Sequence, residues 1–212
     1  TVAAGLARNL AKEGKSVGLL DADIYGPSQP TLFGLKTFKP EFNESKQIIP
    51  ARVDGVKVMS IGFMVDAEKA LVWRGPMVQS AIYQMFRDVE WSNDGEPLDI
   101  LIVDMPPGTG DAQLTLAQKV DVDGAIIVST PQELALTDAR KAVEMFRAVN
   151  VSILGLVENM SSDIFGRGGA KAEADNLDIP FLGEIELSAD IREKADAGKV
   201  YDIPVNLISV LT

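Results

Sequence analysis

Three aspartates follow two apolar segments, in the position where enzymes often carry acids that act on a substrate. Asp21 and Asp23 close the run 17–23, Val-Gly-Leu-Leu-Asp-Ala-Asp, and Asp104 closes the run 98–104, Leu-Asp-Ile-Leu-Ile-Val-Asp. Because Asp21 and Asp23 are two residues apart, an extended chain would direct both to the same side. Carboxylate oxygens suit magnesium, which keeps several of its waters when it binds. The pattern favours a site for a magnesium-bound phosphate compound.

Each acid also has a structural interpretation. Asp104 could cap a helix or a turn, and the 21–23 pair could be a solvated strand end with an Asx turn at Asp23. The segment 106–110, Pro-Pro-Gly-Thr-Gly, favours the catalytic interpretation, because it gives a stiff turn and then Gly108, whose N–H can approach a phosphate closely. In that interpretation Asp21 belongs to the hydration shell of magnesium, Asp104 lies beside the ion, and Asp23 positions the attacking water.

Composition restricts the chemistry. The 212 residues include no histidine and no cysteine, so carboxylates, lysine, arginine, hydroxyls and backbone amides must carry it. A net charge of −11 disfavours nucleic acid and anionic membranes as partners. No apolar run approaches the roughly 20 residues of a membrane span, and no leader peptide is recognised. We therefore expect a cytoplasmic protein whose residues 1–212 form a single domain.

The elements that must position the acids follow from hydrophobic periodicity. Short apolar runs, of the kind that parallel sheets bury on both faces, predict strands at 17–23, 56–61, 98–104, 124–129, 152–157 and 181–185. Helical stripes predict helices at 2–12, 78–89, 112–119, 137–148, 170–176 and 189–197. This alternation indicates an α/β fold, a doubly wound and mostly parallel sheet flanked by helices. The longest irregular connection is 26–50. The first helix has no strand before it, so we expect the start of the fold to be missing from the sequence.

Several segments together resemble the Mrp/ApbC family of iron–sulfur cluster carriers, which are deviant-Walker P-loop ATPases (SIMIBI class) related to MinD, ParA and nitrogenase iron protein. The two most specific are Asp-Ile-Tyr-Gly-Pro-Ser (23–28) and Asp-Met-Pro-Pro-Gly-Thr-Gly-Asp (104–111). The others are Trp-Arg-Gly-Pro (73–76), Ser-Thr-Pro-Gln (129–132), Val-Glu-Asn-Met-Ser (157–161), Ile-Phe-Gly-Arg-Gly-Gly (164–169) and Pro-Phe-Leu-Gly-Glu (180–184).

The resemblance implies roles for individual residues. Asp21 and Asp23 fall in switch I, and residues 104–111 form the Walker B and switch II region. Asn159 would bind adenine, although a strand-end turn residue is the alternative. Residues 73–76 would lie near a dimer interface or form an ordinary loop with a buried tryptophan.

Two motifs of the family do not stand in this sequence. A deviant Walker A, Gly-Lys-Gly-Gly-Val-Gly-Lys-Ser, would directly precede Thr1, which is all that could remain of this nucleotide-binding loop. A Cys-X-X-Cys would lie between Ser161 and Ile164, where only Ser162 and Asp163 stand. We expect the full-length protein to contain both.

By resemblance, the protein binds Mg²⁺ and ATP, hydrolyses ATP slowly, and holds a [4Fe–4S] cluster in a homodimer. It would exchange clusters with scaffold proteins and apo iron–sulfur proteins. One alternative is a MinD- or ParA-like positioning ATPase, whose membrane-binding form is disfavoured because no lysine or arginine follows Lys199. The other is a nucleotide-binding scaffold without turnover.

Overall fold

A computed structural model describes residues 1–64, 75–92, 95–108, 111–199 and 201–204. The chain divides into two compact units. The first comprises Thr1–Pro107 together with Asp190–Asp202, and the second comprises Gly108–Ala189 together with the C-terminal residues from Ile203. Within the described residues, no helix has both the length and the apolar character needed to cross a bilayer.

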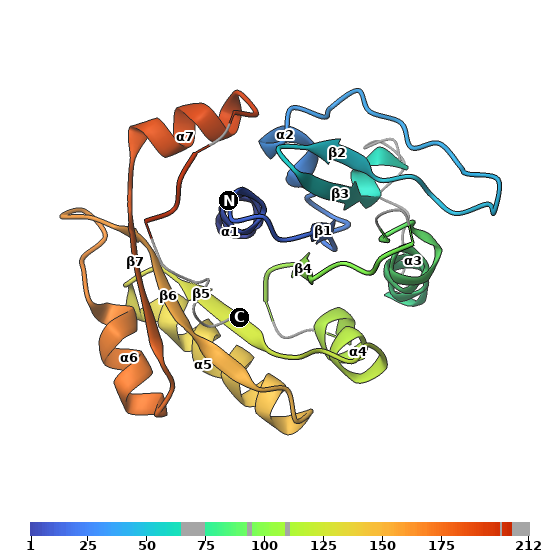
Figure 1. The fold of residues 1–212 in the computed structure, drawn as a ribbon. Helices are drawn as coiled ribbons and strands as arrows, with labels where there is room; N and C mark the ends of the chain where they lie inside the picture. Colours follow the sequence, from blue (N-terminus) through green and yellow to red (C-terminus); the bar gives the residue numbers. More distant parts are fainter. Residues whose placement is uncertain (65–74, 93–94, 109–110, 200, 205–212) are drawn as a thin grey trace. The chain divides into compact units, whose positions relative to one another are not determined.

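The first unit contains a four-stranded sheet with the strand order β2-β3-β1-β4 (Figure 1). These strands are β1 (Val17–Asp21), β2 (Ala51–Val53), β3 (Val56–Ser60) and β4 (Ile100–Asp104). β1 is parallel to β3 and β4, whereas β2 is antiparallel to β3. Every residue of β1 is buried, as expected for an internal strand covered on both faces. At Gly18 a Cβ would come within 2.9 Å of the side chains of Leu98, Leu101 and Trp91, so close packing requires glycine there.

Helices of the first unit are α1 (Val2–Lys12), α2 (Gln29–Leu32) and α3 (Gly75–Asp88), together with the 3₁₀ turn η1 (Ile61–Phe63) and nearly all of α7 (Ala189–Asp196). α1 packs against β1, β3 and β4. Its Arg8 is fully buried and pairs with Asp54 at 2.9 Å. Arg8 also donates to the Leu32 carbonyl at 3.0 Å, and its guanidinium lies 4.1 Å from the centre of the Phe33 ring. Arg8 therefore connects α1 to the end of α2.

The second unit has a three-stranded, fully parallel sheet with the order β5-β6-β7. Its strands are β5 (Ala125–Ser129), β6 (Ile153–Ser161) and β7 (Phe181–Glu186), and its helices are α4 (Asp111–Lys119), α5 (Glu133–Ala148) and α6 (Gly169–Leu177). α5 and α6 lie along the sheet (Figure 1). The main core between these helices and the sheet is formed by Ile127, Leu136, Ala139, Val143, Leu156, Ala170 and Ala174.

The α/β class, with mostly parallel strands and flanking helices, is confirmed, and each predicted helix and strand has a counterpart. Three short elements were not predicted: α2, β2 and η1. They have three or four residues each, too few to show a hydrophobic period. β6 extends to Ser161, beyond the predicted end at residue 157, because Glu158 and Asn159 still pair with β7 although they interrupt the apolar run.

Candidate functional site

Asp21 and Asp104 are brought together by strand register. Asp21 ends β1 and is paired with Asp104 at the end of β4 and with Ser60 at the end of β3. Residues paired in adjacent parallel strands lie about 4.8 Å apart and point to the same face of a sheet. The carboxyl ends of three neighbouring strands therefore present two acids and a hydroxyl in one row, at the edge where open α/β sheets bind their ligands.

Asp21 is completely buried, and its carboxylate is surrounded by hydrogen-bond donors. It accepts from Ser60 Oγ at 2.9 Å, from the Gln29 N–H at 3.1 Å and from the Asp23 N–H at 3.3 Å. Burial raises its pKa to about 6, against the effect of these hydrogen bonds, and the charge of Asp104 adds to the increase. An ionised Asp21 thus lies where a cation would be favourable.

Asp104 is partly buried, and its carboxylate accepts a hydrogen bond of 2.5 Å from Gln29 Nε2. Its pKa is raised, chiefly by burial, and the charge of Asp23 contributes. The Asp104 carbonyl also accepts from the Ala22 N–H at 2.9 Å, which continues the pairing of β4 with the chain just beyond β1. Two neighbouring carboxylates whose pKa values are both raised are typical of a functional site.

Asp23 differs from the predicted arrangement in one respect. β1 ends at Asp21, so the two acids are not carried by one extended strand as we expected. Asp23 Oδ1 instead accepts from the N–H groups of Tyr25 and Gly26, both at 3.2 Å, and so forms an Asx-type turn. In this structure Asp23 therefore has the contacts of an Asx turn, which was the structural alternative for this residue. Its side chain remains close enough to Asp104 for its charge to affect the Asp104 pKa.

Gln29 was not among the predicted site residues. This residue is fully buried at the start of α2, and it contacts both acids: its N–H donates to Asp21 and its side-chain amide donates to Asp104. Its Oε1 is buried and has no hydrogen-bond partner among the described residues. No spacing rule identifies a lone glutamine between serine and proline as buried, so nothing in the sequence pointed to it.

Thr1 lies at the N-terminus of α1, where its carbonyl accepts from the Gly5 N–H at 3.1 Å and from the Tyr201 hydroxyl at 2.8 Å. The backbone nitrogen of Thr1 lies close enough to Asp104 and Asp21 to interact electrostatically with both carboxylates. The N-terminus of α1 therefore lies close to the two acids. Backbone N–H groups at a helix N-terminus favour phosphate.

Gly108 and Asn159 belong to the second unit. Gly108 has a φ of +91°, which favours glycine, and its carbonyl accepts from Gln113 Nε2 at 3.1 Å. Asn159 is partly buried in β6, opposite Ile185 of β7. Trp73 and Arg74 of the 73–76 segment, and residues 109–110 of the switch II segment, lie outside the described residues.

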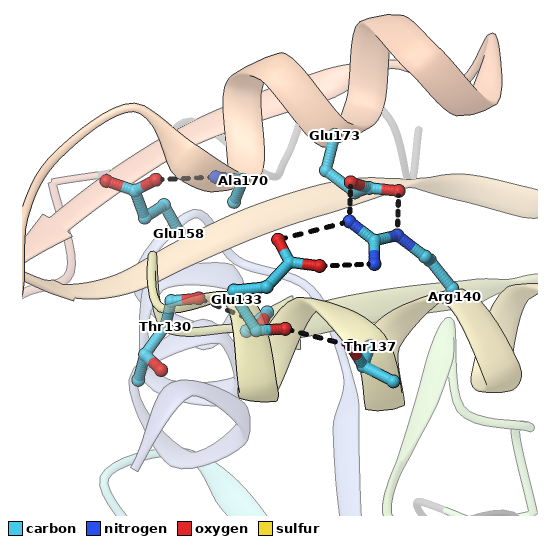
Figure 2. A network of polar contacts seen from close by, with 8 residues as sticks. Thr130, Glu133, Thr137, Arg140, Glu158, Ala170 and Glu173 are labelled. Carbon is cyan, nitrogen blue, oxygen red and sulfur yellow. Dashed lines mark hydrogen bonds and ion pairs between the residues drawn. The ribbon is translucent and has the colours of Figure 1, made fainter.

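A second polar network holds the N-terminus of α6 (Figure 2). The buried Glu158 accepts from the N–H groups of Gly168 and Ala170, both at 2.8 Å, and from Ser161 Oγ at 2.6 Å. Glu158 therefore fixes both ends of the segment 161–169. This is the segment in which the resemblance places the cysteine motif.

Arg140 fixes the same helix from α5 (Figure 2). It forms a two-pronged ion pair with the buried Glu173 of α6, with both N···O distances 2.7 Å, and it also pairs with Glu133 at 2.7 Å. At Gly169 a Cβ would lie 2.3 Å from the Pro131 carbonyl oxygen, so only glycine permits this approach of α6 to the turn before α5. The segment 161–169 thus starts and ends on a rigid support.

The acidic row suits magnesium held through water. Among the described residues, no three acidic side chains gather closely enough to ligate a metal ion directly. Two carboxylates and the unpartnered Gln29 Oε1 are all acceptors, however, and waters bound to magnesium act as donors. The residues present therefore fit an ion whose direct ligands include phosphate oxygens.

Solved structures define the class of protein. A nucleotide-binding protein from Archaeoglobus fulgidus, solved in complex with ADP, superposes with a TM-score of 0.79 at 38% identity, covering 94% of this chain and 80% of that one. The cell division ATPase MinD of Pyrococcus furiosus superposes with a TM-score of 0.69 at 23% identity, covering 93% and 81%, which supports the fold alone. The fold is that of a MinD/ParA-like P-loop NTPase.

Comparison with family models and curated relatives identifies the family within this class. A family model described as the NUBPL iron-transfer P-loop NTPase matches residues 1–206, and the chain belongs to this family. An iron–sulfur cluster carrier protein of Pseudomonas fragi is 50% identical over 210 residues, which cover 94% of this chain and 72% of the relative. The iron–sulfur cluster transfer protein NUBPL of Dictyostelium discoideum is 47% identical over 94% of this chain and 64% of its own length. An Aquifex aeolicus carrier is matched over 57% of its length. The chain thus spans roughly 57–72% of these relatives.

Proposed function

We propose that the full-length protein is an ATP-dependent iron–sulfur cluster carrier. It binds and slowly hydrolyses ATP, carries a [4Fe–4S] cluster as cargo within a homodimer, and exchanges it with scaffold proteins and apo iron–sulfur proteins. Membership of the NUBPL family and the relatives named as cluster carriers support the cargo. The proposal of a nucleotide site rests on one observation: Asp21 and Asp104 are paired in register at the carboxyl ends of β1 and β4.

The acids and the N-terminus of α1 have different roles in phosphoryl transfer. Asp21 and Asp104 orient the waters of magnesium, which supplies positive charge to the phosphate oxygens when bound. Asp23 leaves its turn contacts to position the attacking water. Backbone N–H groups at Thr1 and Gly108 bind phosphate, and Asn159 binds adenine. Hydrolysis then requires positioning and charge neutralisation rather than covalent chemistry.

The segment 161–169 carries the cargo. The cluster ligands of the family lie between Ser161 and Ile164, and the contacts of Glu158 to Ser161, Gly168 and Ala170 hold the two ends of this segment. ATP binding changes the conformation of the dimer and thereby the accessibility of the cluster, as in other ATPases that act through switch loops.

Anaerobic reconstitution of the full-length protein with iron and sulfide tests the proposal. We expect the absorption of a [4Fe–4S] cluster, and transfer of that cluster to an apo-ferredoxin at a rate that changes with ATP. Absence of a cluster together with ATP-dependent binding to lipid vesicles or DNA would identify a positioning ATPase instead. Nucleotide binding without turnover would identify a scaffold.

A further inference from the structure

Gln29 is the residue that connects the two acids of the site. Its backbone N–H donates to Asp21 Oδ2 at 3.1 Å, and its Nε2 donates to Asp104 Oδ2 at 2.5 Å. Gln29 itself is fully buried, so its two donors are shielded from water. Gln29 therefore helps to orient both carboxylates, whereas Ser60 and Asp23 also donate to Asp21.

The amide of Gln29 is held in one orientation. If it were rotated by 180°, Oε1 would face a carboxylate oxygen of Asp104, and two acceptors would repel each other. Nε2 therefore stays on Asp104, and Oε1 points to its other side, where it is buried and has no partner among the described residues. Buried acceptors without a donor are rare in native proteins because they lose their hydrogen bonds to water. An atom of this kind beside two acids indicates a donor that arrives with a ligand.

The chemistry of the neighbourhood indicates which donor this is. The carboxylates of Asp21 and Asp104 attract a cation, and water bound to a cation directs its lone pair at the ion and its hydrogens outward. We propose that Gln29 is a positioning residue of the magnesium–nucleotide site: Oε1 accepts a hydrogen bond from a magnesium-bound water while Nε2 orients Asp104. This inference rests on the proposed function, because it requires that the site bind magnesium with a nucleotide.

Calorimetric titration of ADP into the full-length protein, once with MgCl₂ and once with EDTA, tests the inference. The ratio of the two dissociation constants measures how strongly magnesium supports nucleotide binding. Gln29→Met keeps the length of the side chain and removes both polar atoms. We expect it to reduce this ratio about tenfold, the scale of one hydrogen bond to a charged group, with little change in EDTA. Gln29→Glu adds a carboxylate that needs a cation, and we expect it to increase the ratio.

Gln47→Met is the matched control, since Gln47 has an ordinary side-chain hydrogen bond with Asn43 and does not contact the acids. A purely structural role of Gln29 would change ADP binding equally with and without magnesium in Gln29→Met and in Gln29→Glu, and that result would overturn the inference. If magnesium supports ADP binding as strongly in Gln29→Met as in the wild type, the inference about Gln29 is overturned and the proposed function is not. Wild-type ADP binding that does not depend on magnesium would overturn the proposed function as well.

Discussion

Asp21 is an acid whose ionisation is more costly in the folded protein than in the unfolded chain. Its pKa rises from the ordinary value of 3.8 to about 6, mainly through burial. Between these two values the native state binds more protons than the unfolded state, so this residue lowers the free energy of unfolding as the pH rises. The stabilisation that the protonated Asp21 contributes is fully present below about pH 4 and is lost above about pH 6.

We therefore expect Asp21→Asn to remove a pH-dependent part of the stability of the nucleotide-free protein. The difference in unfolding free energy between wild type and variant should change by about 2–3 kcal/mol between pH 4 and pH 7, with the wild type losing relative stability toward pH 7. Urea unfolding at a series of pH values measures this difference. A difference that stays constant across the series would contradict the assignment of the raised pKa to Asp21.

At the same scale, the sequence pointed to the acids of the proposed site but not to how they are held. Asp21 and Asp104 were identified because each ends an apolar run, a pattern that depends only on neighbours along the chain. Gln29 was missed because its importance comes from contacts across the fold, to residues 8 and 75 positions away. The turn at Asp23 was an open alternative, because an Asx turn and a catalytic acid require the same residue type at the same place.

At the scale of elements, the Gly-Arg-Gly-Gly segment that precedes and begins α6 has a steric explanation. Gly166 and Gly168 have positive φ values with open space around them, whereas Gly169 packs against the Pro131 carbonyl. In the sequence these three glycines are part of a segment that resembles the family. The structure distinguishes two that are needed for backbone conformation from one that is needed for close packing.

Gly169→Ala should therefore destabilise the protein more than Gly166→Ala. A Cβ at Gly169 would lie 2.3 Å from backbone and force α6 away from the turn, which we expect to cost about 2–3 kcal/mol. A Cβ at Gly166 meets no atom within 4 Å, and its φ of +89° costs about 1 kcal/mol. Chemical denaturation of both variants measures the difference, and equal losses would show that the approach to Pro131 does not constrain α6.

Elements long enough to show a period were predictable, and shorter ones were not. α1 has the predicted bounds, because eleven residues display a full amphipathic stripe. α2 contains only Gln29–Leu32, yet it delivers the residue that joins Asp21 and Asp104. Its placement depends on packing against β3 rather than on local preference, and the pattern of a single sequence does not show such packing.

At the scale of the whole molecule, the family assignment and the residues of the site support one function from different directions. The family model and the carrier relatives indicate iron–sulfur cargo, whereas the acidic row of the first unit indicates magnesium and a phosphate compound. The cluster cargo of this chain, its magnesium–nucleotide site and the connection between the two are all proposals. The expectation that residues 1–212 form a single domain also remains a proposal, and the chain divides into two compact units.

The central claim is that the register pair Asp21–Asp104 is the magnesium–nucleotide site, and steady-state ATP hydrolysis by the full-length protein tests it most directly. We expect magnesium-dependent hydrolysis in the wild type, and a loss of kcat on the order of 100-fold in Asp104→Asn, the scale of removing one contact that stabilises the transition state. The exposed control Asp121→Asn should hydrolyse ATP like the wild type. Hydrolysis by Asp104→Asn at the wild-type rate, with the same dependence on magnesium, would contradict the account.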